Sequence, residues 1–202
     1  SDLLRRGPVA LVLAPQREPD TGLPGIASVH LHRAIADHLT LHTQVVVKVM
    51  SHELLSDSDS VARFSREAAA AASVRSPHVV QMLDHGVTND GTPFIVMELL
   101  DGHDLLTHIG RVGRMPPGEV ATVISQVAKA LSRAHEVHLV HRDIKPENIF
   151  LCDVGRGDPF IKLLDFGIAK GVRGRLSNMT QSGLIMGTPY YMSPEAIVSP
   201  DA

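Results

Sequence analysis

The stretch HRDIKPEN, residues 141–148, places a His-Arg pair, an aspartate, a lysine and an asparagine within one octamer. Most charged octamers are solvated polar loops, and such a loop requires no particular residues elsewhere in the chain. The alternative is a catalytic loop, in which an acid, a cation and an amide face one reacting group. The rest of the sequence decides between these two interpretations.

The composition is that of an ordinary globular protein. The 202 residues are long enough for one large domain or two small ones. A hydrophobic content of 44% with 20% charged residues argues against disorder. A net charge of -3 and only 3% aromatic residues give no support for nucleic-acid binding. No apolar run approaches the roughly 20 residues needed to span a bilayer, so we expect a cytoplasmic protein without membrane contact.

The single cysteine and the histidines offer no zinc site. Cys152 can form no internal disulfide and indicates a small buried thiol in a reducing compartment. None of the 12 histidines shows the paired spacing of zinc ligands. We expect His141 to serve packing and hydrogen bonding.

The two halves of the chain differ in character. The first half predicts strands at 45–50 and 93–100, with a helix over 60–75 for which Ser60 is the expected N-cap. The second half predicts a long helix over 116–138, followed by short apolar runs at 148–151 and 160–164. This pattern predicts an α+β protein with a β-rich lobe that contains one main helix and a mainly helical lobe. The hinge between the lobes falls near Glu98 to Gly102.

Three further polar residues lie within, or directly after, predicted strands and helices. Lys48 lies inside an apolar strand, where a lysine is costly unless it is paired. Glu67 lies on the predicted helix and is the expected partner of that lysine. Asp165 directly follows an apolar run. These three residues favour the catalytic interpretation of the octamer.

The motifs VVVK, REAAA, HRDIKPEN, DFG and GTPYYMSPE occur in this order. The set resembles the eukaryotic-like serine/threonine protein kinases of bacterial type, over roughly residues 22 to 198. The resemblance implies a two-lobed kinase fold with an N-lobe at 22–100 and a partial C-lobe at 101–202, which carries the catalytic loop and activation segment. Residues 1–21 are left unassigned, and the catalytic domain is expected to be truncated after the A-P-E-like SPE motif.

The resemblance also implies roles in phosphoryl transfer, which depends on positioning and charge stabilisation. Asp143 would accept the proton of a substrate hydroxyl, and Lys145 would stabilise the transferred phosphate. Asn148 and Asp165 would bind Mg²⁺, with Mn²⁺ as a substitute, because such cations prefer oxygen ligands. Lys48 would hold the ATP phosphates, with Glu67 fixing its position.

A nucleotide site between the lobes follows from the same resemblance. The residues expected to contact ATP, besides Lys48, are Gly22, Gly25, Val29, Val46, Met97, Glu98, Leu100, Asp104 and Phe150. The phosphate-covering loop departs from the family pattern, because Pro24 and Ala27 stand at two of its three glycine positions. Pro24 removes an N–H donor and stiffens the loop.

Regulation and rival functions remain open at this point. Arg142 beside Asp143 is typical of kinases whose activation segment is ordered by phosphorylation, and Thr180 and Ser182 are the candidate acceptors. The resemblance implies protein substrates, and dimerisation would permit autophosphorylation. The degenerate glycine loop keeps a pseudokinase, acting as a nucleotide-binding or docking module, as the main alternative. A small-molecule phosphotransferase is a third, which Lys145 and the GTPYYMSPE segment disfavour.

Overall fold

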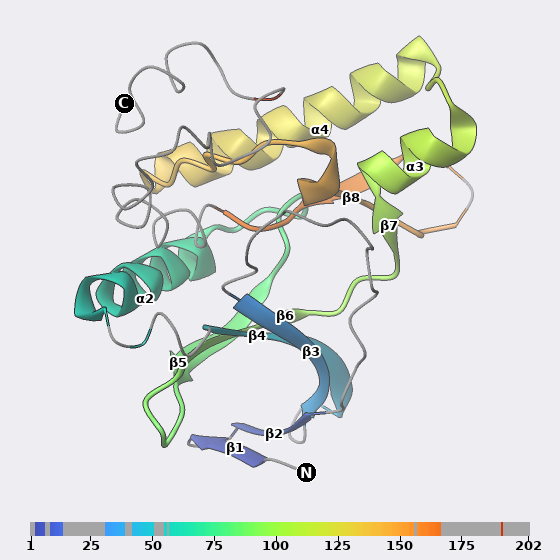
Figure 1. Cartoon of the computed structure of the whole chain (residues 1–202). Helices are drawn as coiled ribbons and strands as arrows, with labels where there is room; N and C mark the ends of the chain where they lie inside the picture. Colours follow the sequence, from blue (N-terminus) through green and yellow to red (C-terminus); the bar gives the residue numbers. More distant parts are fainter. Residues whose placement is uncertain are drawn as a thin grey trace, which may run out of the picture.

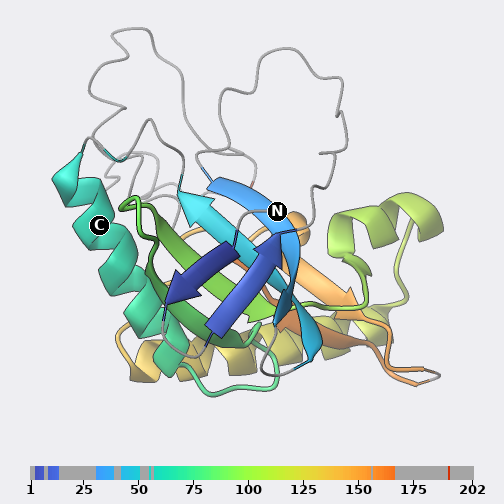
Figure 2. The same ribbon diagram turned by 90° about the horizontal axis from the view of Figure 1, so that it is seen from below.

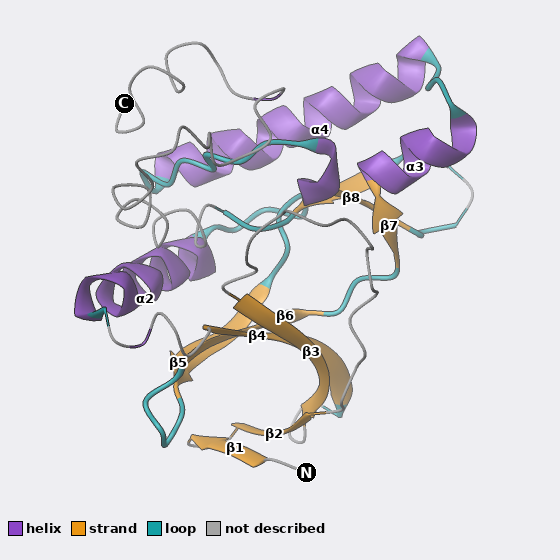
Figure 3. Cartoon of the chain, in the orientation of Figure 1, coloured by secondary structure: helices purple, strands orange, loops and turns teal. Residues whose placement is uncertain are grey.

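The computed structural model of the chain has two lobes, one built on a β-sheet and one mainly helical (Figures 1 and 3). The structure describes residues 3–6, 9–13, 31–38, 42–50, 55, 57–155, 157–166 and 191, with side chains from residue 34 onward. This arrangement confirms the expected two-lobed α+β fold. Among the described residues, no helix is both long enough and apolar enough to span a bilayer.

The N-terminal lobe is a six-stranded antiparallel sheet. Its spatial order is β1 (Leu3–Arg6), β2 (Val9–Leu13), β3 (Leu31–His38), β4 (Thr43–Met50), β6 (Pro93–Glu98) and β5 (Met82–Val87). The sheet therefore begins well before residue 22, in the segment that sequence analysis left unassigned. The VALVL run of β2 is apolar enough for a strand, but a five-residue run alone does not reveal the partner strand with which it pairs.

The central strands of this sheet are buried on both faces. Val45 and Val47 of β4 point to a core formed with Ala36, Phe94 and Val96. Lys48 and Met50 point to the other face, because successive side chains of a strand alternate between its two faces. Lys48 is only 6% exposed, which makes a charged partner necessary.

Helix α2 (Ser58–Ser73) runs along one side of the sheet (Figure 2). It buries Phe64, Ala68 and Ala71, and its run of alanines lets the backbone approach the strands closely. The expected N-cap at Ser60 is wrong. Asp57 caps the helix by accepting from the backbone N–H of Asp59 and from the Ser60 hydroxyl, because a carboxylate can serve both donors.

The second lobe contains a small sheet and two helices. Its elements are β7 (Gly102–Asp104), α3 (Leu105–Val112), α4 (Pro117–Glu136), a 3-10 turn η1 (Pro146–Asn148), β8 (Ile149–Cys152) and β9 (Phe160–Leu163). The long helix and the two apolar runs expected here are confirmed within one or two residues. Strands β7, β8 and β9 pair in that order, antiparallel.

Two features tie this small sheet in place. Gly102 has φ of 135°, and a Cβ there would lie 2.0 Å from the Leu151 carbonyl oxygen, so only glycine permits the β7–β8 contact. Helix α4 holds β9 through Gln126, whose amide accepts from the Ile161 N–H at 2.8 Å and donates to the Pro159 carbonyl at 2.7 Å. At the edge of β9, the Gln126 amide thereby makes the hydrogen bonds that a neighbouring strand would otherwise make.

One hydrophobic core runs through both lobes. It includes Phe64 and Met97 from the first lobe and Leu151, Ile161 and Phe166 from the second. The chain crosses between the sheets through residues 99–101, after β6 ends and before β7 begins. The polar residues singled out in the sequence lie around this junction.

Candidate active site

The catalytic-loop candidates form one hydrogen-bonded cluster. The Asn148 side-chain amide donates to the Asp143 carbonyl at 2.8 Å and to Asp143 Oδ2 at 3.0 Å. Lys145 Nζ lies 3.3 Å from the same Oδ2. Asn148 is 7% exposed, whereas Asp143 and Lys145 are about a quarter exposed. The buried Asn148 amide thus orients the Asp143 carboxylate, which in turn pairs with the Lys145 ammonium, and both charged groups are accessible to solvent.

Local backbone geometry explains how six residues achieve this. Pro146 starts the 3-10 turn, in which the Asn148 N–H donates to the Lys145 carbonyl at 2.9 Å. Arg142 adopts φ of 60°, in the left-handed region that costs a non-glycine residue energy. This turn brings Asn148 back over Asp143, five residues earlier.

His141 ties the loop to the segment that carries Asp165. The ring is 1% exposed and packs on Phe166, with ring centroids 4.7 Å apart. Its Nδ1 accepts from the Asp143 N–H at 3.3 Å, so Nε2 carries the proton and donates to the Leu164 carbonyl at 2.8 Å. Burial lowers the pKa of His141, and its hydrogen bond to Leu164 offsets part of that effect. The expected packing role is confirmed.

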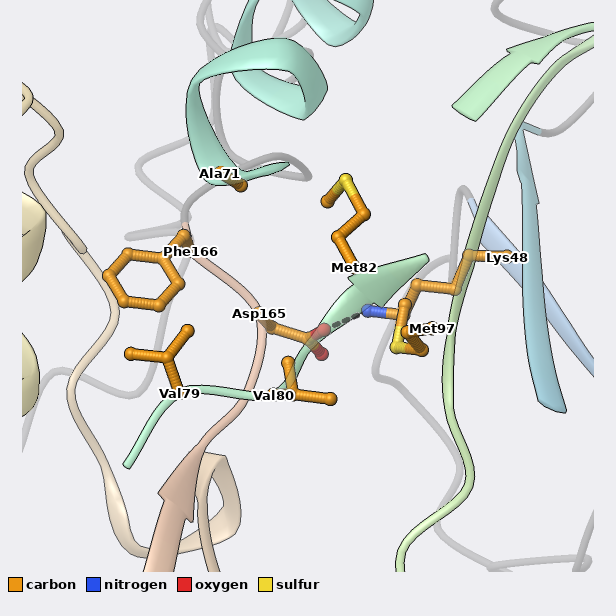
Figure 4. Close-up of a pocket in the computed structure, with 8 residues that line it drawn as sticks. All are labelled: Lys48, Ala71, Val79, Val80, Met82, Met97, Asp165 and Phe166. Carbon is orange, nitrogen blue, oxygen red and sulfur yellow. Dashed lines mark hydrogen bonds and ion pairs between the residues drawn. The ribbon is translucent and has the colours of Figure 1, made fainter. Parts of the chain in front are cut away.

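Asp165 reaches the site from the end of β9. The Leu164 N–H donates to the Asn148 carbonyl at 2.9 Å, which places Asp165 beside the catalytic loop. Asp165 itself has φ of 55°, a second left-handed residue at this site. Its Oδ1 forms an ion pair with Lys48 Nζ, drawn as the dashed contact in Figure 4.

The expected pairing of Lys48 with Glu67 is not formed in this structure. Lys48 is bound to Asp165 instead. Among the described residues, Glu67 Oε2 is buried and has no hydrogen-bond partner. Burial raises the pKa of Glu67, and the positive charges of Arg142, Arg63 and Arg66 lower it in part. Asp165 lines the same pocket as Lys48, whereas Glu67 is not among the residues that line it.

A pocket opens beside the Lys48–Asp165 pair. Figure 4 shows the two charged groups meeting at its side, with Met97 next to Lys48 and Phe166 next to Asp165. The remaining lining is apolar: Ala71, Val79, Val80 and Met82. The ion pair thus lies against apolar side chains, and the side chains of Lys48 and Asp165 are only 7% and 22% exposed.

The residues expected to contact a nucleotide fall into two groups. Val46, Met97, Glu98, Leu100, Asp104 and Phe150 all lie in the described segments that meet between the lobes. Gly22, Gly25 and Val29 of the phosphate-covering loop, and the candidate phosphorylation sites Thr180 and Ser182, lie outside the described residues. The strands that flank the loop segment, β2 and β3, pair antiparallel.

Asp104 and Glu98 already have structural partners. Asp104 is the N-cap of α3, accepting from the Thr107 N–H at 2.7 Å and the Thr107 hydroxyl at 2.9 Å. Glu98 Oε1 lies 2.5 Å from Lys162 Nζ and accepts from the Gln81 N–H at 2.6 Å. Lys162 lies within the apolar run FIKLL, so it carries the same sequence signal as Lys48, namely a lysine that needs a partner.

The donor set suits a divalent cation. Asn148 and Asp165 supply an amide oxygen and a carboxylate, which are hard ligands of the kind Mg²⁺ prefers. The backbone bond between Asn148 and Leu164 keeps these two side chains on neighbouring segments. The described residues contain no cluster of three His, Cys, Asp or Glu side chains that would bind a metal unaided, so further ligands would come from phosphate oxygens or water.

Comparisons with known proteins agree with this geometry. Residues 34–202 match the family described as protein kinase domain. Serine/threonine-protein kinase pkn3 of Myxococcus xanthus is 45% identical over 163 residues, which cover 79% of this chain and 30% of that protein. Serine/threonine-protein kinase PknB of Mycobacterium leprae is 36% identical over 177 residues, covering 86% of this chain and 27% of that protein.

The fold agrees as well. The crystal structure of the Mycobacterium tuberculosis PknI kinase domain aligns with a TM-score of 0.60 at 34% identity, over 70% of this chain and 56% of that one. The chain thus spans less than a third of the two named relatives' sequences. The sequence match, the fold and the cluster around Asp143 lead to one conclusion: the chain belongs to the protein kinase domain family, with bacterial serine/threonine-protein kinases among its relatives.

Proposed function

We propose that this protein is a serine/threonine protein kinase that transfers the γ-phosphate of ATP to hydroxyl groups of protein substrates. The observation that carries this proposal is the cluster of Asp143, Lys145 and Asn148 beside the Lys48–Asp165 pair. Three polar residues of one loop and two from distant parts of the sequence, Lys48 and Asp165, contribute to this site. A merely structural loop would not need an acid, two ammonium groups and two metal-ligand side chains at one place.

In the proposed reaction, the Asp143 carboxylate takes the proton of the substrate hydroxyl. The hydroxyl oxygen forms a bond to the γ-phosphorus, and the bond from that phosphorus to the bridging oxygen breaks to release ADP. Lys145 stabilises the negative charge of the transferred group. Asn148 keeps Asp143 oriented through the bonds at 2.8 and 3.0 Å.

Membership of the family implies the general use of ATP and a divalent cation. That the cation is Mg²⁺, with Mn²⁺ as a substitute, and that Asn148 and Asp165 hold it, belong to the proposal. When bound, the cation would neutralise charge on the phosphate oxygens. Lys48 would then exchange its contact with Asp165 for the phosphates and for Glu67, whose buried and unpartnered oxygen is available for it.

The proposed adenine site lies between the lobes. Val46 on β4 would cover the base and Phe150 on β8 would support it, with Met97 at the back. The backbone of Glu98 and Leu100 would bond the adenine edge, and Asp104 would face the ribose. Val29 and the loop of Gly22 and Gly25 would cover the phosphates. In this division the N-lobe ends at residue 100, and residues 101–202 belong to the C-lobe.

Phosphorylation of Thr180 or Ser182 is the proposed control. Arg142 lies beside Asp143, where a phosphate on the activation segment would pair with its guanidinium. We expect the Thr180→Ala, Ser182→Ala double variant to lose most of its phosphate incorporation and activation. Full activity of that variant would contradict the regulatory part of the proposal.

The experiment that tests the function is intact-mass spectrometry after incubation with Mg²⁺ and ATP. We expect phosphate to appear on the wild-type chain or an added substrate protein, and not with Asp143→Asn. Asp153→Asn, which removes the same charge from an exposed loop, is the matched control and should behave as wild type. No phosphate from a folded wild-type chain, with folding shown by circular dichroism, would favour a pseudokinase.

A further inference from the structure

A second charged pair bridges the two lobes behind the site described above. Lys162 Nζ of β9 lies 2.5 Å from Glu98 Oε1 of β6, and the Gln81 N–H donates to the same oxygen at 2.6 Å. The side chains of Lys162 and Glu98 are 17% and 26% exposed. We call Gln81, Glu98 and Lys162 the hinge cluster. No step of the proposed reaction uses it.

The strand register places Lys162 beside the proposed adenine site. Lys162 pairs with Phe150 on β8, and Phe150 pairs with Asp104 on β7. Directly opposed residues of an antiparallel sheet share one face. Lys162, Phe150 and Asp104 therefore form a row across the face of the small sheet that meets the hinge.

The backbone around Lys162 is fixed to the first lobe on both sides. The Leu163 N–H donates to the His78 carbonyl at 2.9 Å, and the Val80 N–H donates to the Leu163 carbonyl at 3.0 Å. His78 Nδ1 also lies 3.1 Å from the Ile161 carbonyl oxygen. Because Ile161 and Leu163 are anchored, the backbone of Lys162 is already placed, and the contact with Glu98 costs mainly the ordering of the lysine side chain.

Glu98 is held from two directions at the end of β6. Its N–H donates to the Gln81 carbonyl at 3.0 Å, while its carboxylate accepts hydrogen bonds from the Gln81 N–H and from Lys162 Nζ. The residue that follows is the first of the connection between the lobes. The Glu98 side chain thus links the end of β6, where the connection between the lobes begins, to a charge on the other lobe.

We propose that Lys162 is a positioning residue for the nucleotide: its pair with Glu98 sets the hinge backbone that receives the adenine edge. This inference rests on the proposed function, because it assumes that the nucleotide binds at this hinge. Breaking the pair leaves a half-buried charge without its partner, and the hinge moves away from the arrangement that the nucleotide needs. Lys162 acts through Glu98 and does not touch the reacting atoms.

The first test measures the affinity of fluorescent mant-ADP for the whole chain. We expect Lys162→Met and Glu98→Gln each to weaken binding about 5-fold, since a half-buried pair ranks between exposed and fully buried ones. The double variant should be no weaker than the single ones, because they remove one shared interaction. Lys162→Arg should restore binding to within about 2-fold.

The matched control is Glu136→Gln, which breaks the exposed ion pair between Glu136 and Arg133 on α4. It removes the same charge and should leave mant-ADP affinity unchanged. In turnover, the Lys162 and Glu98 variants should raise the KM for ATP with little change in kcat, whereas a general loss of structure would lower kcat as well. Single variants that bind as wild type, or effects that add in the double variant, would overturn the proposal.

The second test does not need a nucleotide. Burial raises the pKa of the Cys152 thiol; among the smaller effects, Lys162 lowers it and Glu98 raises it. Iodoacetamide, which reacts with the thiolate, should therefore label Cys152 more slowly in Lys162→Met and faster in Glu98→Gln. Equal rates would contradict the placement of Lys162 and Glu98 near Cys152, on which the proposed pair depends. If the variants show these shifts but the wild-type chain binds no mant-ADP, the proposed function and the nucleotide role would be contradicted, whereas the placement of the two charges would be supported.

Discussion

Replacing His141 with phenylalanine removes both hydrogen bonds of a buried imidazole while keeping an aromatic ring in its place. The ring contact with Phe166, at 4.7 Å between centroids, can persist in the variant. The Leu164 carbonyl and the Asp143 N–H, however, lose the partners that they have at 2.8 and 3.3 Å. The substitution therefore tests the polar role of His141 apart from its packing.

The expected cost follows from those two backbone groups. A buried donor or acceptor left unsatisfied costs about 1–3 kcal/mol. The bond to Leu164 is short, and the bond to Asp143 is long and belongs in the lower part of that range. We expect His141→Phe to reduce the free energy of unfolding by about 2–4 kcal/mol at about pH 8. The assay is urea unfolding followed by circular dichroism at 222 nm.

The pH dependence provides a sharper test. Burial lowers the pKa of His141 below its ordinary value of 6.5, so below that pH the unfolded chain binds a proton that the folded chain resists. The stability contributed by neutral His141 is thus present above about pH 6.5 and is lost as the pH falls further. The difference in unfolding free energy between wild type and His141→Phe should shrink from about pH 8 to about pH 5.5.

Subtracting the two proteins at each pH removes the titration of all other groups that behave alike in both. A difference below about 0.5 kcal/mol at about pH 8 would refute the hydrogen-bond argument, since it is within the range of surface substitutions. A difference that stays constant with pH would refute the assignment of a buried neutral imidazole. A phosphotransfer assay on the same samples should also show reduced turnover, because Asp143 loses a restraint.

Three further predictions concern neighbouring parts of the molecule. Glu67→Gln should raise the urea midpoint at about pH 7 but not at about pH 4, because burial penalises only the ionised carboxylate. The variant should also have lower turnover. An unchanged midpoint at neutral pH would contradict the assignment of a buried, unpartnered carboxylate oxygen. Gln126→Ala should cost about 1–3 kcal/mol in urea unfolding, because two backbone groups at β9 lose their partner, whereas the exposed Lys129→Ala should not. Asp104→Ala should reduce the free energy of unfolding by about 1 kcal/mol through the loss of a helix cap, whereas Asp104→Asn keeps the cap. Weaker mant-ADP binding in both variants would support a contact between Asp104 and the ribose. Unchanged binding in both would argue against that contact.

Local stretches of this sequence determined the catalytic loop. Asp143, Lys145 and Asn148 lie within six residues, and a single turn started by Pro146 brings them together. The helical period of 116–138 determined α4 in the same way, because both patterns are short in range. The N-terminal strands were missed, since β2 is five residues long and pairs with β3 across a long connection.

Only the tertiary structure decided which charges meet. Lys48 lies 117 residues from Asp165, and Lys162 lies 64 residues from Glu98. From the sequence, each lysine in an apolar strand requires a carboxylate, but Glu67, Glu98 and Asp165 are equally suitable by residue type. The choice depends on how the two sheets pack over their shared core, because that packing decides which carboxylate lies within reach of each lysine. The residues that carry the chemistry are thus apparent in the sequence, whereas their partners are set by the packing of the lobes.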